Sequence, residues 1–285
     1  MKVLAIKRKE QFSPNHVGND TAILNAVCEE LEKKGVEVEI CDEVSFLEKT
    51  IIEQDFIINM SRSKASVSKL LLLEDMGKRV INSPYGIQQC FRKNMTLALL
   101  DNEVPYPASD VVNTTSDIRP SFDKLGGSAL WIKRGDFHAI HREDVSFAAS
   151  LEEAQSILHE FARRGIEEAV LSEHLAGDLV KFYAVKDTDF FYWFYPYEHN
   201  HHKYAIYEQI NGGTLHYSFK EEDLKRTAQQ AATTLGVDIY GGDAIVSPTG
   251  KLHIIDLNDW PSFAPCRAEA SEAIAEFLFT QLHAQ

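Results

Sequence analysis

The chain contains few cysteines, and they are not spaced as a disulfide framework or a metal site would require. The four cysteines are Cys28, Cys41, Cys90 and Cys266. Thiols scattered in this way are typical of reduced cysteines in a cytoplasmic protein. The sequence also contains no internal repeat and no low-complexity tract. We therefore expect a cytoplasmic, globular protein that does not depend on disulfide bonds.

Long hydrophobic runs and positive charge are also scarce. No stretch approaches the roughly 20 apolar residues of a membrane span, and the apolar run within residues 1–8 is too short for a signal peptide. Lysine and arginine total 29 against 43 aspartates and glutamates, so the net charge is −14 at pH 7. This excess of acidic residues argues against general binding to nucleic acid or to an anionic membrane. We expect a small-molecule or peptide substrate, and the sequence leaves open whether the protein forms a homo-oligomer.

The first third of the chain alternates strand-like and helical patterns, which predicts an α/β fold with a parallel sheet. A length of 285 residues exceeds what one compact core usually spans, so two or three lobes are expected. Ligands bind such sheets at the carboxyl ends of the strands. The loop after the strand predicted at 55–60 carries Arg62 and Lys64, which could hold an anionic substrate. Solvated loop cations are an equally good interpretation.

The rest of the chain mixes helices with longer, antiparallel-looking strands. Helices are predicted at 84–100, 152–164, 221–235 and from about residue 267 onward. Strands are predicted at 129–133 and 168–173, and an aromatic-rich antiparallel section at 179–217.

A hairpin near the end of the chain carries the most informative set of polar residues. Two apolar runs, 243–246 and 252–258, flank a Ser-Pro-Thr-Gly turn. Side chains two apart on a strand share a face, so Asp256 and Asn258 point the same way and Asp243 can face them from the neighbouring strand. Three oxygen donors without histidine or cysteine suit Mg²⁺, which shares its shell with waters and substrate phosphates. An acidic surface hairpin is the alternative.

Two lysines upstream could complete a phosphate site. Lys93 lies in the helix predicted at 84–100, and Lys133 follows an apolar strand and precedes a glycine. Phosphoryl transfer needs charge neutralisation and positioning more than covalent help, so lysines from separate elements can clamp phosphates. A surface role is the more common one for a lone lysine, but the setting of Lys133 is unusual for a solvated side chain.

In this order, the features resemble the ATP-grasp superfamily from about residue 80 to the end of the chain. The resemblance implies ATP as a cofactor together with Mg²⁺, with Mn²⁺ as the alternative ion. It implies a metal site at Asp243, Asp256 and Asn258. It further implies that ATP is bound by Lys93, Lys133, Glu173, His174, Leu175 and Asp178.

The resemblance also implies an α/β (α+β) architecture with three lobes. The expected divisions are a Rossmann-like N-terminal domain at 1–83, a central lid domain at 84–172, and a C-terminal domain with the metal site at 173–285.

Two features depart from the pattern of this superfamily. Many members have Lys-Pro and several glycines in the loop that covers the phosphates, whereas here Arg134 replaces the proline and only Gly135 is nearby. Peptide-ligase members often carry an arginine shortly before the first metal aspartate, and residues 240–242 here are Tyr-Gly-Gly. Lys181 or Arg267 could supply the missing catalytic cation.

The resemblance leaves three functions to compare. Residues 55–59, 80–84 and 211–213 are similar to the ribosomal-protein glutamate ligase branch, which favours an ATP-dependent carboxylate–amine ligase acting through an acyl-phosphate. Residues 180–185 and 254–261 also resemble inositol-polyphosphate kinases of the same fold, which favours phosphorylation of a hydroxyl. A non-catalytic nucleotide-binding protein is the third alternative, and the intact metal set argues against it.

Three closely spaced histidines, His199, His201 and His202, invite a zinc interpretation. Histidines packed so closely rarely all face one ion, and no cysteine accompanies them. A solvated or substrate-facing loop is the better interpretation.

Overall fold

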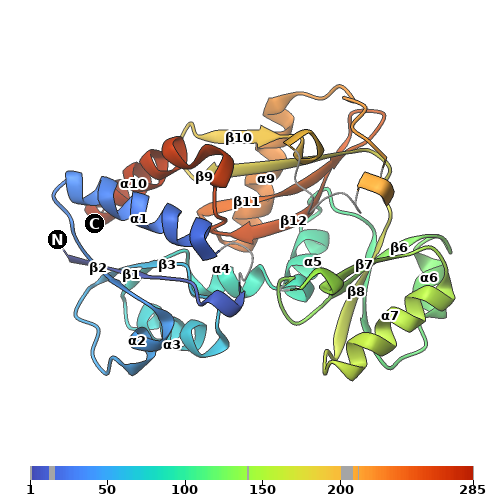
Figure 1. Ribbon diagram of the computed structural model, residues 1–285, viewed down its shortest axis with the longest axis horizontal. Helices are drawn as coiled ribbons and strands as arrows, with labels where there is room; N and C mark the ends of the chain where they lie inside the picture. The colour runs from blue at the N-terminus through green and yellow to red at the C-terminus, as the bar shows by residue number, and fades with distance from the viewer. Residues whose placement is uncertain (1, 13–16, 140, 200–207, 211, 285) are drawn as a thin grey trace.

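The computed structural model describes residues 2–139, 141–199, 208–210 and 212–284, except for residues 13–16. It has three four-stranded sheets, each with its own helices (Figure 1). The α/β architecture expected from the sequence is confirmed. Among the described residues, no helix combines the length and the apolar character needed to cross a membrane.

The N-terminal sheet is parallel and has helices on both faces. Its strands, in spatial order, are β2 (Glu37–Cys41), β1 (Lys2–Ile6), β3 (Phe56–Asn59) and β4 (Arg79–Ile81). Val3 and Ala5 pack toward α1 (Val17–Lys33), whereas Leu4 and Ile6 pack toward α2 (Glu43–Glu48) and α3 (Lys64–Asp75). Because both faces are covered, the inner strands β1 and β3 are apolar at successive positions, whereas the edge strand β2 alternates polar and apolar residues.

The central sheet is antiparallel and has a separate apolar core. Its strands are, in spatial order, β5 (Ser109–Asn113), β8 (Glu168–Glu173), β6 (Leu130–Arg134) and β7 (Val145–Ala148). Helices α6 (Arg119–Lys124) and α7 (Leu151–Arg163) provide the rest of this core. The short helix η2 (Arg142–Asp144) precedes β7. This lobe therefore buries its apolar side chains largely among themselves.

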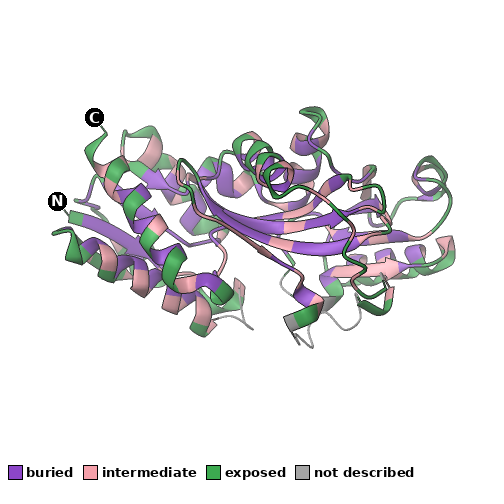
Figure 2. Cartoon of the chain, turned by 90° about the horizontal axis from the view of Figure 1, so that it is seen from above, coloured by how far each residue is buried: buried purple, intermediate pink, exposed green. Residues whose placement is uncertain are grey.

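The C-terminal sheet is antiparallel and is covered on both faces. Its strands are, in spatial order, β10 (Phe191–Phe194), β9 (Asp178–Val185), β11 (Ile239–Val246) and β12 (Leu252–Asp259). Helices α5 (Arg92–Asp101) and α9 (Glu221–Leu235) pack on one face, and α10 (Arg267–His283) packs on the other face and against α1. Figure 2 shows the buried strands running between helices that are exposed on their outer sides.

One predicted helix is divided in the structure. In place of the single helix expected at 84–100, the structure has two helices, α4 (Pro84–Gln89) and α5. They are separate because Phe91, between them, adopts an extended conformation. Its ring packs against Phe137 of the central lobe at a centroid distance of 4.6 Å. Helix α5, which the sequence-based division placed in a central domain, contributes Met95 and Leu99 to the core of the C-terminal lobe.

Candidate nucleotide and metal site

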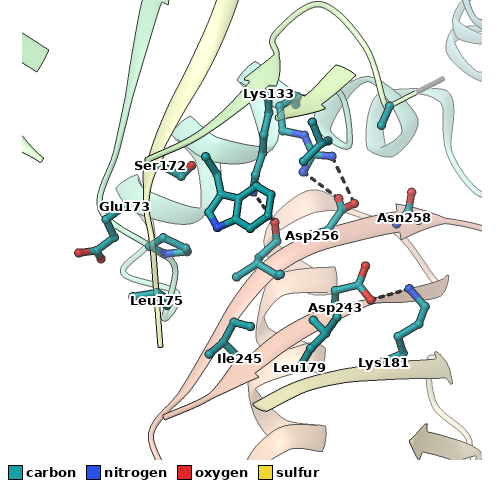
Figure 3. A pocket seen from close by; sticks show the side chains of 16 residues that line it. Lys133, Ser172, Glu173, Leu175, Leu179, Lys181, Asp243, Ile245, Asp256 and Asn258 are labelled. Carbon is teal, nitrogen blue, oxygen red and sulfur yellow. Dashed lines mark hydrogen bonds and ion pairs between the residues drawn. The ribbon is translucent and has the colours of Figure 1, made fainter. Parts of the chain in front are cut away.

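A pocket of about 270 Å³ lies between the central and C-terminal sheets. Its lining comes from β6 and β8 on one side and from β9, β11 and β12 on the other (Figure 3). The lining includes seven of the residues predicted from the sequence: Lys133, Glu173, Leu175, Lys181, Asp243, Asp256 and Asn258. Residues from distant parts of the chain are thus brought together at one place.

The predicted hairpin exists, and it places the two aspartates opposite each other. Asp243 on β11 pairs with Asp256 on β12, and the register shifts at a bulge directly after Asp243. Gly242 precedes Asp243 because there is no room for a side chain: a Cβ there would lie 2.3 Å from the carbonyl oxygen of Asp256 and 2.7 Å from the Phe182 ring. The glycine lets the strands approach closely and so holds both carboxylates on the pocket side.

Each aspartate is paired with a cation from another element. Arg92, the first residue of α5, binds Asp256 with both terminal nitrogens, at 3.0 and 3.2 Å. Lys181 on β9 contacts the Oδ1 atom of Asp243 at 2.5 Å. Burial by itself raises the pKa of Asp256, but the charges of Arg92, His138 and Lys133 together with the hydrogen bonds from Arg92 outweigh it and hold that pKa well below its usual range. Asp256 is therefore ionised throughout the neutral pH range.

Lys133 lies in the wall of the pocket and is almost completely buried. Its Nζ atom donates a hydrogen bond to the carbonyl oxygen of Ile255 at 3.1 Å. Burial lowers the pKa of Lys133 to about 7, the Arg92 charge acts in the same direction, and Asp256 and Asp243 oppose both. The amine is thus poised to gain a proton when negative charge enters the pocket.

The segment that leaves β8 forms the opposite end of the pocket. The Oε1 atom of Glu173 accepts the backbone N–H of Ala108 at 2.8 Å. His174 does not line the pocket itself, but its Nδ1 accepts the indole N–H of Trp131 at 3.1 Å. Burial lowers the pKa of His174, which keeps this ring nitrogen available as an acceptor. Trp131, which does line the pocket, is held in place by this bond.

The donor set at the hairpin fits a hard divalent cation. Asp243 and Asp256 offer carboxylate oxygens and Asn258 offers an amide oxygen. Within the part of the chain that the structure describes, no group of three or more His, Cys, Asp or Glu side chains could hold a metal. Two carboxylates and an amide suit Mg²⁺, which completes its shell with water and phosphate oxygens. Softer metals that prefer nitrogen or sulfur do not match this set.

Besides His174, two residues that the sequence assigned to ATP lie outside the pocket lining. Lys93 on α5 forms a partly exposed ion pair with Glu168, the first residue of β8, at 2.7 and 2.9 Å. Asp178 is buried, and its carboxylate accepts the backbone N–H groups of Leu215 and Tyr217, each at 2.7 Å. Its side chain therefore fixes the segment that leads to α9.

The residues predicted to bind substrate or supply a catalytic cation are also distributed differently. Arg62 is buried, and its Nη2 lies 3.0 Å from the carboxylate of Asp259. Lys64 is the exposed first residue of α3. Arg267 donates to Asn19 of α1 at 2.8 Å. Of the two cations proposed to replace the absent arginine, Lys181 lines the pocket and Arg267 does not.

Two further points complete this comparison with the sequence. His201 and His202 lie outside the described residues, as does the side chain of His199. Arg92 was missed, although it directly precedes Lys93. The structure places Arg92 at the first position of α5, after the partly buried and extended Phe91, and the sequence shows no sign of this break in the predicted helix.

Comparisons with known proteins show the fold. No protein-family model matches the chain, and no curated protein matches it by sequence. Solved structures do match along nearly the whole chain. A RimK-domain ATP-grasp protein from Sphaerobacter thermophilus is 13% identical with a TM-score of 0.68, and the match covers 98% of this chain and 100% of that one.

Two ligases give similar values. The D-alanine–D-alanine ligase from Bacillus anthracis complexed with ATP is 15% identical with a TM-score of 0.68, over 99% of this chain and 97% of that one. The VanG D-Ala:D-Ser ligase from Enterococcus faecalis is 11% identical with a TM-score of 0.70, over 98% of each chain. The chain therefore has the ATP-grasp fold, as the sequence predicted.

Proposed function

We propose that this protein is an ATP- and Mg²⁺-dependent ligase that joins a carboxylate to an amine on a small molecule or peptide. The observation that carries the proposal is the charge arrangement of the pocket. Asp243 and Asp256 face each other across β11 and β12, and Arg92, Lys133 and Lys181 surround them. The opposed carboxylates suit a metal ion and the surrounding cations suit the phosphates of a nucleoside triphosphate.

We assign roles to nine of the residues that line the pocket. Trp131, Glu173 and Leu175 bind the base of ATP, and Lys133 and Arg92 bind its phosphates. Arg92 thus takes the part that the sequence assigned to Lys93. Asp243, Asp256 and Asn258 would hold Mg²⁺, which would neutralise charge on the phosphate oxygens. When Mg²⁺ and ATP bind, Arg92 and Lys181 exchange their aspartate partners for phosphate oxygens.

The reaction proceeds in two transfers. A carboxylate oxygen of the substrate attacks the γ-phosphorus, the bond to the β-phosphate oxygen breaks, and ADP leaves. The amine nitrogen then attacks the acyl carbon, the bond from that carbon to the phosphate oxygen breaks, and the amine loses one proton. Lys181, beside Asp243, stabilises the negative charge that develops on the acyl-phosphate.

Similar structures support this proposal. The two described as ligases join amino acids or related units, and one of them was determined with ATP. The carboxylate substrate is therefore proposed to be an amino acid or a short peptide.

The test is a screen for ATP cleavage across amino acids, peptides and polyols, each with and without an amine acceptor. A ligase is expected to consume ATP only with a carboxylate, and hydroxylamine should convert the acyl-phosphate to a hydroxamate detectable by mass spectrometry. A stable phosphate ester without hydroxamate would replace the ligase with a kinase. ATP binding without cleavage under any condition would favour a non-catalytic nucleotide-binding protein.

A further inference from the structure

The segment that connects β6 to β7 is anchored at its base within the central lobe. Asp144 is completely buried there, and its carboxylate contacts Arg134 at 3.2 Å and also pairs with Arg164. The same carboxylate accepts the backbone N–H of His141 at 2.9 Å. These contacts fix the end of the segment but leave its tip, Phe137 and His138, to be held by other means.

The tip is held by the other two lobes. The Phe137 ring lies 4.6 Å from the ring of Phe91, which precedes α5, and 5.2 Å from that of Phe12 in the short N-terminal helix η1 (Glu10–Phe12). Next to it, the Nε2 atom of His138 lies 3.2 Å from Oδ1 of Asp259, the last residue of β12. His138 is 4% exposed and Asp259 is fully buried.

Asp259 is in turn held by the N-terminal lobe. Arg62 contacts its carboxylate at 3.0 Å and donates to its carbonyl oxygen at 2.8 Å. Arg8 donates to the carbonyl oxygens of Asp259 and Trp260, at 3.3 and 2.9 Å. One carboxylate therefore joins an imidazole of the central lobe, a guanidinium of the N-terminal lobe and the strand that carries Asp256 and Asn258.

The contact between His138 and Asp259 is close but not aligned. Among the described residues, neither ring nitrogen of His138 makes a hydrogen bond of acceptable geometry. The Oδ1 atom of Asp259 that faces His138 lies 3.0 Å from Nη2 of Arg62, so the carboxylate has a partner whereas the imidazole has none of good geometry. Buried polar groups are normally satisfied, and an unsatisfied one is costly. At 3.2 Å the two groups are within hydrogen-bond distance, so the direction of the ring N–H, and not the separation, is what the contact lacks. Ala139, the next residue, lines the pocket, so a ligand that touches the segment acts directly beside His138.

We propose that His138 is a positioning residue that docks the tip of the β6–β7 segment onto Asp259, and that a nucleotide triphosphate in the pocket aligns this contact. The inference rests on the proposed nucleotide site and adds to it a coupling between the three lobes. Docking holds the segment at the pocket wall, where Ala139 lies, and fixes its position relative to β12, which carries Asp256 and Asn258. His138 itself does not contact the nucleotide.

The test compares substitutions at two histidines of the same segment. His138→Leu removes both ring nitrogens at similar volume, and His138→Gln keeps an N–H donor near the Nε2 position. His141→Leu is the matched control, because that side chain is exposed. Calorimetry measures Mg²⁺–ATP affinity, and hydrogen exchange with mass spectrometry measures ATP-induced protection of the amides of residues 135–139.

His138→Leu is expected to lower ATP affinity about tenfold, in the range seen when a supporting contact is removed from a site, and to abolish the ATP-induced protection. His138→Gln and His141→Leu should both stay close to wild type. A purely structural role would lower the melting temperature without changing the protection that ATP induces in the folded protein, and that result would overturn the proposal. Wild-type affinity and protection in His138→Leu would overturn it as well.

A second pair of variants covers the case in which His138→Leu does not fold. His138→Asn is also polar but places its amide too far from Asp259, so it should lose the protection that His138→Gln retains. Equal behaviour of these two variants would overturn the proposal. If the wild-type protein bound no Mg²⁺–ATP, the proposed function would fall and the inference with it. Binding by wild type together with an unaffected His138→Leu would remove this inference alone.

Discussion

Strand β12 carries two aspartates three residues apart, and the two have different surroundings. Asp256 pairs with Arg92 at the edge of the pocket, and its side chain is 22% exposed. Asp259 pairs with Arg62 at the junction of the three lobes, and its side chain is fully buried. A pair that borders a cavity can exchange its partner for a ligand, whereas a pair without access to solvent can only be broken at high cost. We therefore expect the Arg92–Asp256 pair to open when a ligand binds, and the Arg62–Asp259 pair to stay closed and hold the lobes together.

Asp259→Asn should mainly reduce the stability of the protein. It leaves Arg62 and Arg8 buried with less compensating charge, so the free energy of unfolding should fall by about 3–5 kcal/mol. Urea unfolding followed by circular dichroism measures the loss. Asp238→Asn, which affects the partly exposed pair with Lys186, is the control and should cost less than about 1 kcal/mol. A similar loss for both variants would contradict the distinction between the two sites.

Asp256→Asn should mainly reduce the catalytic activity of the protein. Loss of one carboxylate from the metal site is expected to lower turnover by about 10²–10³-fold, because charge on the phosphates is no longer neutralised. The loss of stability should be smaller than for Asp259→Asn. Release of ADP in a coupled assay with the identified substrate measures turnover. A variant that turns over at nearly the wild-type rate would show that Asp256 does not hold the metal.

Binding of ATP at pH 8 should add a proton to Lys133. Burial lowers the pKa of this amine to about 7, so it is mostly neutral at pH 8 in the free protein. Neighbouring phosphate favours its charged form and raises the pKa, which gives an uptake of up to about one proton per ATP. Calorimetry in two buffers with different ionisation enthalpies measures the uptake.

Two controls sharpen this measurement. At pH 6 the free amine is already charged, so the uptake should disappear. Lys133→Arg stays charged at every accessible pH and should take up no proton at pH 8. An unchanged uptake in Lys133→Arg would assign the proton to another group.

Lys93→Ala should produce the smallest effect. Lys93 and Glu168 are more than one-third exposed, and such pairs contribute about 0–1 kcal/mol. ATP affinity should stay within about twofold of wild type, whereas Arg92→Lys, which cannot make the bidentate contact, should weaken it several-fold more. Titration of ATP followed by intrinsic tryptophan fluorescence compares the two variants. A larger loss in Lys93→Ala would restore the role that the sequence assigned to it.

The hairpin could be predicted because its pattern is local. A Pro-Gly turn between apolar runs fixes an antiparallel pair, and the two-residue period of a strand fixes which side chains share a face. Asp256 and Asn258 therefore lie in the pocket, as expected, and Asp243 lies opposite them. Lys133 was predictable for a similar reason, since it lies on a short apolar strand directly before a glycine loop.

The misplaced residues depend on partners that are far away in sequence. Arg62 looked like a free loop cation because its partner, Asp259, is 197 residues away. Asp178 was predicted to bind ATP, but its carboxylate accepts the backbone N–H groups of Leu215 and Tyr217, which are 37 and 39 residues later in the sequence. Arg92 and Lys93 are neighbouring cations whose side chains point in different directions from α5, and the direction of a helical side chain depends on where the helix begins. Because the predicted helix began at residue 84 and not at Arg92, the sequence could not show which of the two side chains faces the pocket.

The packing of α10 has a consequence for how the chain unfolds. This last helix shares one apolar core with α1 and the N-terminal strands, and Arg79 on β4 donates to the carbonyl oxygen of Gln281 at its end. The N- and C-terminal lobes thus share one apolar core across α1 and α10, and we expect them to unfold as one cooperative unit, whereas the central lobe is an insertion with its own core. Heat should melt the insertion and the closed unit as two separate transitions, and removal of α10 should abolish only the transition of the closed unit.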